Sequence, residues 1–219
     1  MSNVLVIAAH PDDELLGVGG TVCLHALRGD RIKSIIMCEG ESLRYGRDVG
    51  QSTATMTAAA ILGVEEVIQP RFPDQRLDTF TLTDLITPIE QVSETFHPDI
   101  VYCQCGYDAN QDHQRLFEAA NIALRPTSEW VREFYTFYTC SSTEWGYPRN
   151  FAPDTWVDIS DVLSKKIEAF EAYSSEVKAY PHPRSSDALR YQAHFWGNQV
   201  CMDAAEVFMT VRRIQRKDA

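Results

Sequence analysis

Short apolar runs alternate with helical segments along most of the chain, and this alternation restricts the fold more than any other feature. Residues 3–9 (NVLVIAA) form a continuous apolar run rich in β-branched side chains, which is typical of a strand buried on both faces. Further strands are predicted at residues 32–38, 66–72, 99–105, 131–139 and 156–159. Helices are predicted at residues 15–27, 53–62, 83–96, 114–124 and 161–177, and a terminal helical region follows the proline-rich loop 180–184.

This order of elements predicts a three-layer α/β/α sandwich with a mainly parallel sheet. Gly63 stands where a glycine ends a helix, and Ser160 is predicted to cap the helix that begins at Asp161. Neither an internal repeat nor a linker divides the sequence, so residues 1–219 are predicted to form a single domain.

The charge and cysteine content exclude several classes of protein. Acidic residues outnumber basic residues 31 to 20, which argues against a nucleic-acid-binding surface. No stretch approaches the roughly 20 apolar residues that span a bilayer, and the apolar N-terminal run lacks the basic flank of a signal peptide. The 6 cysteines contain no C-x-x-C pair, so we expect reduced thiols and a cytoplasmic protein. A homo-oligomer is compatible with this composition.

Two polar clusters follow predicted strands. Residues 9–14 (AHPDDE) come after the first strand, and residues 108–113 (DANQDH) come after the fourth. In a sheet of order 3-2-1-4-5 the first and fourth strands are neighbours, so both clusters lie at the carboxyl edge of the sheet, at the topological switch point. Ligands bind there in open α/β sheets, so this edge is the predicted site.

The residue types in these clusters suit a divalent metal. A catalytic zinc takes about three protein ligands and leaves one position open, and His10, Asp13 and His113 can supply the three. Asp12 is then available as a general base, and Asp112 could orient a ligand. Carboxylates after a strand also cap helices, so the pattern alone leaves a purely structural role open.

The first cluster also matches the hallmark motif of the PIG-L/LmbE-like deacetylases, and the second resembles that family's second motif. Residues 72–78 and 180–185 look like segments of one branch of the family, and the resemblance extends from residue 3 to about residue 213. It implies a Rossmann-like fold and a Zn²⁺-dependent hydrolase that removes the acetyl group from an N-acetylated sugar such as N-acetylglucosamine. It also implies His10, Asp13 and His113 as zinc ligands and Asp12 as the base.

The chain departs from the family pattern at two places. Many members carry a histidine, proposed to stabilise the oxyanion, where this chain has Asn110. An asparagine can donate a hydrogen bond to an oxyanion but cannot transfer a proton. The end of the fourth strand, Thr-His in relatives, reads Cys-Gln-Cys at residues 103–105. We therefore expect Asn110 in the oxyanion role and look elsewhere for a general acid.

Three arginines and one histidine are further candidates for the site. Arg44 follows the second strand and resembles a substrate ligand of the family, while a solvated surface charge is the alternative. Arg76 follows the third strand, where a salt bridge within its own loop is the alternative to substrate binding. His182 and Arg184 lie in a loop stiffened by prolines. His182 is the candidate acid for the leaving amine and Arg184 a candidate substrate ligand.

These features predict a hydrolase of a linear amide bond in an N-acetylated amino sugar or its conjugate. One alternative is an amidase acting on another N-acyl small molecule. A second is a non-catalytic metal-binding protein, against which the free carboxylate of Asp12 argues. Trp145 and Tyr147 could stack on a sugar ring, although aromatic side chains more often pack in a core.

Overall fold

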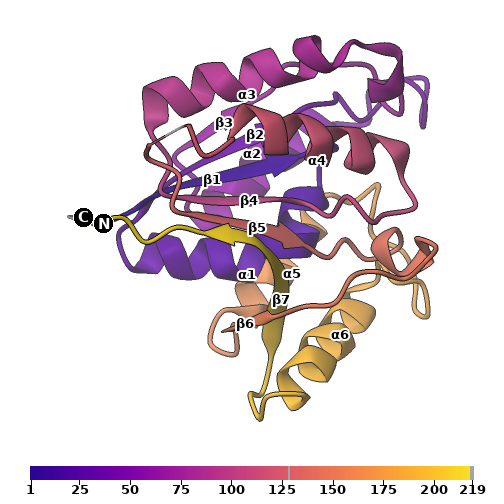
Figure 1. Ribbon diagram of the computed structural model, residues 1–219. Helices are drawn as coiled ribbons and strands as arrows, with labels where there is room; N and C mark the ends of the chain where they lie inside the picture. Colours follow the sequence, from indigo (N-terminus) through magenta and orange to yellow (C-terminus); the bar gives the residue numbers. More distant parts are fainter. Residues whose placement is uncertain (128, 218–219) are drawn as a thin grey trace.

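The computed structural model describes residues 1–127 and 129–217, and Figure 1 shows one sheet between two layers of helices. The strands of the described part are β1 (Asn3–Ala8), β2 (Arg31–Ile36), β3 (Glu66–Ile68), β4 (Ile100–Gln104), β5 (Glu133–Phe137), β6 (Thr155–Asp158) and β7 (Ala205–Arg213). Its α-helices are α1 (Asp13–Leu27), α2 (Gln51–Leu62), α3 (Leu82–Phe96), α4 (Gln111–Ala123), α5 (Leu163–Glu171) and α6 (Ser186–Asn198), joined by the 3₁₀ turns η1 (Leu77–Thr79) and η2 (Thr143–Trp145).

The sheet has the strand order β3-β2-β1-β4-β5-β7-β6. β1 to β5 are parallel, as the alternation of strands and helices requires, and Val4 of β1 pairs with Ile32 on one side and Ile100 on the other. β7 runs antiparallel to both β5 and β6. The predicted order 3-2-1-4-5 and the mainly parallel sheet are therefore confirmed.

Side chains of β1 alternate between two separate cores. Val4 and Val6 join the core formed with α1, α2, α5 and α6, and Leu5 and Ile7 join the core formed with α3 and α4. This period of two on a strand buried on both faces explains its uninterrupted apolar sequence. The three-layer arrangement is thereby confirmed.

The C-terminal segment corrects one prediction. Residues 205–213 form strand β7, although a terminal helical region was expected beyond the proline-rich loop. Only α6 in this region is helical. Phe208 lies opposite Phe137 of β5 and Thr155 of β6, so pairing with two strands distant in sequence determines the conformation.

Two further predicted elements are shorter than expected. Helix α5 begins at Leu163 with Val162 at its N-cap, so Ser160 is not the cap. Ser160 instead donates to Asp158 and accepts the amide of Ala204. Strand β3 ends at Ile68. The chain then passes through Arg71, which has a left-handed φ of 63°, and Phe72 forms an isolated bridge to Cys38.

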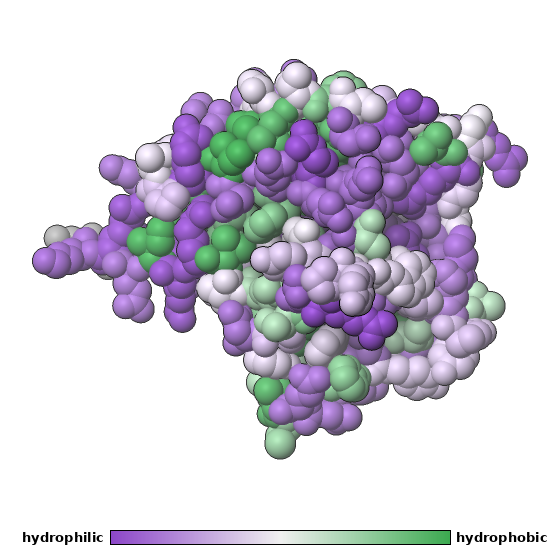
Figure 2. Space-filling model, turned by 45° about the vertical axis from the view of Figure 1, so that its right-hand side comes forward, coloured by the Kyte–Doolittle hydropathy of each residue, from purple (hydrophilic) through white to green (hydrophobic). Residues whose placement is uncertain are grey.

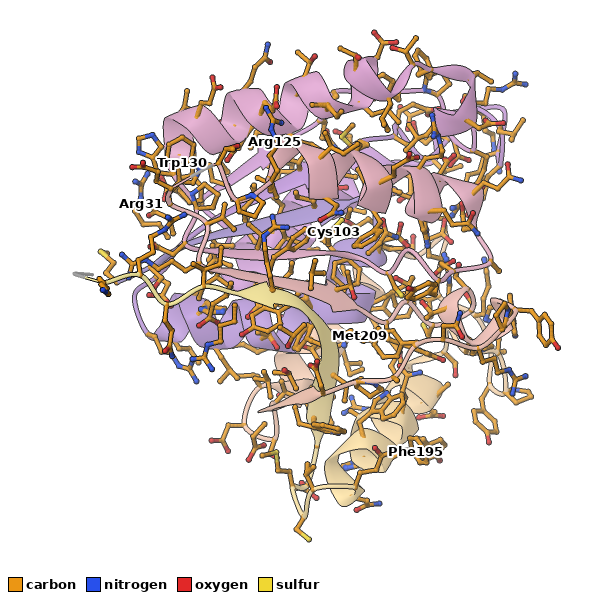
Figure 3. The ribbon with its side chains drawn as sticks, viewed as in Figure 1. Arg31, Cys103, Arg125, Trp130, Phe195 and Met209 are labelled. Atoms are coloured by element: carbon orange, nitrogen blue, oxygen red, sulfur yellow. The ribbon has the colours of Figure 1, made fainter. Side chains whose placement is uncertain are left out.

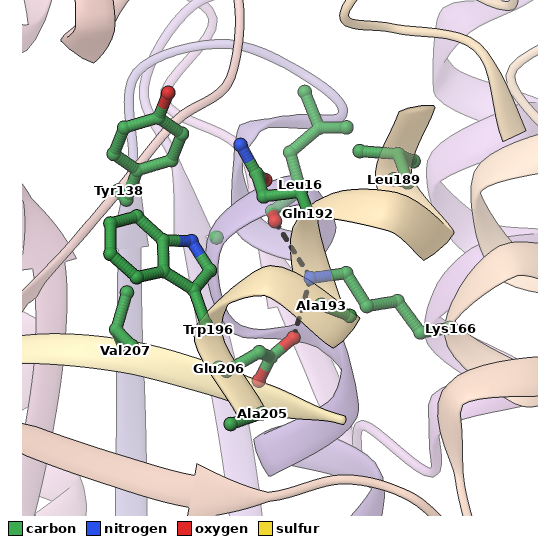
Figure 4. A pocket seen from close by; sticks show the side chains of 11 residues that line it. Leu16, Tyr138, Lys166, Leu189, Gln192, Ala193, Trp196, Ala205, Glu206 and Val207 are labelled. Carbon is green, nitrogen blue, oxygen red and sulfur yellow. Dashed lines mark hydrogen bonds and ion pairs between the residues drawn. The ribbon is translucent and has the colours of Figure 1, made fainter. Parts of the chain in front are cut away.

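A buried ion pair fixes helix α1 against the C-terminal half of the fold (Figure 4). Lys166 Nζ lies 2.6 Å from Glu206 Oε1 and donates to the carbonyl of Leu16 at 2.8 Å. Glu206 also accepts the backbone amides of Gly20 and Thr21 at 2.8 and 2.7 Å. The pair therefore anchors the middle of the helix whose first turn carries the polar cluster.

The glycines of α1 allow close packing and do not form a phosphate-binding loop. A Cβ atom at Gly17 would lie 2.1 Å from the ring of Phe137, and one at Gly20 would lie 2.8 Å from Ile159.

Hydrophilic residues cover most of the face turned forward in Figure 2, and hydrophobic residues occur there in separate groups. No helix in the described ranges is long and apolar enough to cross a membrane.

Candidate metal centre and active site

The two polar clusters meet at the carboxyl ends of β1 and β4, which are neighbours in the sheet (Figure 1). The first cluster links β1 to α1, and Asp12 stands at the N-cap of that helix with a left-handed φ of 96°. A non-glycine residue in this conformation costs of order 1–3 kcal/mol and occurs mainly at functional sites. Asn110 caps α4, because its side-chain oxygen accepts the amide of Asp112 at 2.8 Å.

His10, Asp13 and His113 bring three ligand atoms together. His10 Nδ1 lies 3.0 Å from Asp13 Oδ2, which lies 3.2 Å from His113 Nε2, and the two nitrogens are 3.3 Å apart. Ligands about 2.0–2.1 Å from a tetrahedral zinc are separated by roughly 3.3–3.4 Å. The three atoms are thus spaced as one small divalent cation requires.

Each imidazole has a second carboxylate at its other nitrogen. His10 Nε2 lies 2.9 Å from Asp112 Oδ2, and His113 Nδ1 lies 3.2 Å from Asp108 Oδ1. Such contacts fix the tautomer so that the opposite nitrogen can bind metal, and they raise its basicity. The structure thus brings Asp112 to the position expected of an orienting group, and it adds Asp108.

A second group of potential ligands, His10, Cys38 and Asp112, is less suited to a metal. Burial and the surrounding carboxylates raise the pKa of Cys38, so the thiolate that a metal needs is disfavoured. Asp112 is also engaged by His10 and by the amide of Leu77 at 2.9 Å. The first group is therefore the candidate metal centre.

Buried negative charge around this centre also calls for a cation. Asp12, Asp13 and Asp74 are completely buried. Asp13 Oδ1 and both carboxylate oxygens of Asp74 have no hydrogen-bond partner among the described residues. Buried carboxylate oxygens without a hydrogen bond are costly, and the 3.5 Å contacts of Asp74 with His10 and Arg44 offset this cost only in part. A divalent ion therefore fits the charge as well as the spacing.

The pKa values reflect the same electrostatics. Burial lowers the pKa of His113, but the neighbouring charge of Asp13 and the bond to Asp108 outweigh it and raise this pKa to about 9. Burial raises the pKa of Asp12 to about 7 despite the opposing charge of Arg184. The raised pKa of His113 reflects an imidazole surrounded by carboxylates, and the raised pKa of Asp12 reflects a carboxyl group with little access to water.

Asp12 is fixed by an arginine from the proline-rich loop. Arg184 Nη1 donates to Asp12 Oδ2 at 2.8 Å and to Glu176 at 3.0 Å, and its Nε donates to Ser141 at 2.7 Å. Asp12 Oδ1 is buried and has no partner in the described part of the chain. One oxygen of this carboxylate is therefore held in place while the other is available.

The remaining predicted residues lie at different distances from this centre. Arg44 is near it, 3.5 Å from Asp74 and 3.6 Å from Glu176. Asn110 donates to Gln75 at 3.3 Å, and the Gln75 amide nitrogen lies 3.1 Å from His10 Nε2.

Two predicted residues are exposed. His182 accepts the amide of Arg184 at 3.0 Å and forms no bond with the three metal-ligand candidates in the described ranges. Arg76 makes no ion pair with a described residue, so the alternative of a salt bridge within its loop is not observed.

Sequence reasoning missed two groups that shape the site. Glu176 is buried and binds Arg44, Arg184, Tyr45 and Gln51, yet no motif marks it. Ser142 donates to Asp108 and lies 3.5 Å from His113 Nδ1. Asp108 stands in the second cluster, five residues before the candidate ligand His113, and this position is the signal in the sequence that could have marked it.

Curated relatives share sequence with this chain. The "Uncharacterized deacetylase YaiS" of Escherichia coli (strain K12) is 32% identical over 127 residues, which cover 56% of this chain and 68% of the relative. The "Probable N-acetyl-alpha-D-glucosaminyl L-malate deacetylase 2" of Bacillus anthracis is 26% identical over 188 residues, which cover 80% of this chain and 81% of the relative.

Solved structures share the fold. The conserved protein TT1542 from Thermus thermophilus superimposes with a TM-score of 0.81 at 24% identity, covering 100% of this chain and 98% of that one. GalB, the 4-carboxy-2-hydroxymuconate hydratase from Pseudomonas putida KT2440, has a TM-score of 0.79 at 22% identity, with 100% of both chains covered.

The family model described as PIG-L, GlcNAc-PI de-N-acetylase, matches residues 5–124. This range contains both polar clusters and more than half of the 219 residues. The chain therefore belongs to the PIG-L family of de-N-acetylases.

Proposed function

We propose that the chain is a zinc-dependent N-deacetylase that hydrolyses the acetamide of an N-acetylated amino sugar or its conjugate. The observation that carries the proposal is the convergence of His10, Asp13 and His113 within 3.0–3.3 Å beside the buried carboxylate of Asp12. Membership of a de-N-acetylase family and the relative named for an N-acetyl-glucosaminyl malate substrate support the same reaction.

Zinc bound by these three side chains would act as a Lewis acid on the acetamide oxygen and make water more acidic. Asp12 accepts the proton of the attacking water at Oδ1, because Arg184 already occupies Oδ2. We therefore propose Arg184 as a positioning residue for the base, a role different from the substrate binding predicted from the sequence.

Two other predicted groups complete the mechanism that we propose. The side-chain amide of Asn110 donates to the developing oxyanion, and its only side-chain donor contact in the described part is a long one of 3.3 Å to Gln75. His182 delivers a proton to the leaving amine from a loop tied to the site through Arg184.

Substrate binding is assigned to arginines at the same edge. The ion pairs of Arg44 with described residues are long, 3.5 and 3.6 Å, and Arg44 can exchange them for substrate oxygens. Arg76 is exposed and would meet a substrate at the rim.

We further propose that residues 1–219 act as one domain, since a single sheet contains both β1 and β7. A cytoplasmic location is proposed because all 6 cysteines are free thiols.

The test is acetate release from a panel of N-acetylated sugars and nucleotide sugars by protein loaded with zinc and by the same protein after chelation. We expect release that requires zinc. A hydratase shares this fold, and one fold can host different reactions. The absence of acetate from every compound, with the metal bound, would therefore contradict the deacetylase assignment.

A further inference from the structure

An aromatic groove lies between the loop that follows β5 and helix α6. Its volume is about 700 Å³, within the range of sites for small organic ligands. Six aromatic side chains line it: Tyr138, Trp145, Phe151, Tyr191, Phe195 and Trp196. Neither the metal site nor the mechanism described above uses these rings.

Four of the six rings contact one another. Tyr138 packs edge-on against Phe151 at 5.5 Å and against Trp196 at 5.9 Å between ring centres. Trp196 packs in the same way against Phe195 at 5.0 Å. Such contacts stabilise a fixed arrangement, so this part of the groove is formed before a ligand arrives.

Three of the rings also remain open to solvent. Trp145 is 59% exposed, Tyr191 60% and Phe195 57%. Tyr191 and Phe195 are four residues apart on α6 and therefore share one face of the helix, from which Phe195 projects (Figure 3). A group of exposed aromatic side chains around a hollow marks a binding surface.

The groove is joined to the metal centre by the segment 141–146. Ser142 contacts Asp108 and lies 3.5 Å from His113, and Trp145 follows at the end of η2. Three residues of 3₁₀-helix cover about 6 Å. A Cβ atom at Gly146 would lie 2.9 Å from the carbonyl oxygen of Tyr107 and 3.3 Å from the carbonyl carbon of Asp108, so this segment packs directly on the start of the second polar cluster.

The lining of the groove is mostly apolar, and part of its polar surface is already engaged. Glu144 accepts the amides of Ser141 and Ser142 at 2.7 and 3.1 Å. Arg149 is the cation of the lining and makes no ion pair with a described residue. A second sugar ring would need several partners for its hydroxyl groups, whereas a planar apolar group needs ring faces.

We propose that this groove binds an aromatic aglycone attached to the N-acetylated sugar that the metal centre deacetylates. The inference rests on the proposed function, and it specifies the substrate class as aryl glycosides or similar aryl conjugates. The sugar lies at the metal centre, and the aromatic group extends along the segment 141–146 and stacks on Trp145 and Phe195.

The test compares the methyl and 2-naphthyl glycosides of N-acetylglucosamine. The ratio of their kcat/KM values should favour the naphthyl compound at least tenfold, and Phe195→Ala or Tyr191→Ala should reduce that ratio at least fivefold. Met56→Ala, which removes a side chain 55% exposed on α2 and outside the groove, should leave the ratio unchanged. Equal kcat/KM values for both glycosides in the unmodified protein would overturn the proposal.

Binding measurements separate this inference from the proposed function. If neither glycoside releases acetate, titration calorimetry with the naphthyl glycoside still tests the groove. Binding that Phe195→Ala weakens at least fivefold supports the aromatic site although the deacetylase assignment fails for this sugar. Undetectable binding overturns the inference. It is also overturned if sedimentation shows a dimer that Phe195→Ala converts to a monomer, because a second copy then covers the groove.

Discussion

Lys166→Met should destabilise the protein through the ion pair that anchors α1. The side chains of Lys166 and Glu206 are only 6% and 3% exposed, and their charged atoms are 2.6 Å apart. Methionine preserves most of the length of the lysine side chain but removes its charge. It therefore leaves the carboxylate of Glu206 buried without its cation, which typically costs about 3–5 kcal/mol.

The structure places the expected loss at the lower end of that range. Glu206 keeps three hydrogen bonds after the substitution, from the amides of Gly20 and Thr21 and from the Thr21 hydroxyl. The carbonyl of Leu16 loses its contact with Lys166 as well. We expect the free energy of unfolding to fall by about 3 kcal/mol, which lowers Tm by about 6–12 °C in a domain of this size.

Urea unfolding followed by circular dichroism measures this loss, and Lys165→Met is the matched control because Lys165 is exposed. Lys165→Met should change stability by less than about 0.5 kcal/mol. Adding Glu206→Gln to Lys166→Met should cost less than the sum of both single changes, because the unpaired charge is gone. A loss below about 1 kcal/mol for Lys166→Met would refute the reasoning, since it would mean that the carboxylate is not left uncompensated.

Three further substitutions test other parts of the account. Gly17→Ala should lower the free energy of unfolding by about 1–3 kcal/mol in a urea titration, because its methyl group would lie 2.1 Å from Phe137; unchanged stability would show that the ring moves freely. Arg44→Ala should raise KM with little change in kcat in steady-state kinetics, and a fall in kcat alone would instead assign it to the transition state. Asp112→Asn should weaken zinc affinity about 10–100-fold in a competition titration, and unaltered affinity would remove Asp112 from the support of His10.

Much of the fold follows from local patterns in the sequence. The apolar run 3–9, the glycine at position 63 and the alternation of strands with helices predict the parallel part of the sheet, and the usual topology of such sheets predicts its order. Strand β7 was missed because its conformation depends on the free edges of β5 and β6, which the chain brings together only after folding. The end of α5 at Glu171 depends in the same way on packing that no local signal records.

In the candidate site, too, some residues could be predicted from the sequence and others could not. His10, Asp13 and His113 belong to compact motifs that follow strands, so their meeting at the switch point could be predicted. Glu176 and Ser142 lie in loops without a pattern, and they reach the site through contacts with Arg184 and Asp108. The aromatic groove combines a loop with a helix, and Trp145 and Phe195 are 50 residues apart in the sequence, so only the structure relates them.

The central claim is that adjacent carboxylates perform different tasks, with Asp13 binding zinc and Asp12 accepting the proton of water. The direct test measures zinc stoichiometry and acetate release on Asp12→Asn and Asp13→Asn side by side. Asp12→Asn should retain one zinc per chain while kcat falls by about 10²-fold or more, and Asp13→Asn should lose zinc as well. Acetate release at the unmodified rate by Asp12→Asn, or full zinc retention by Asp13→Asn, would contradict the account.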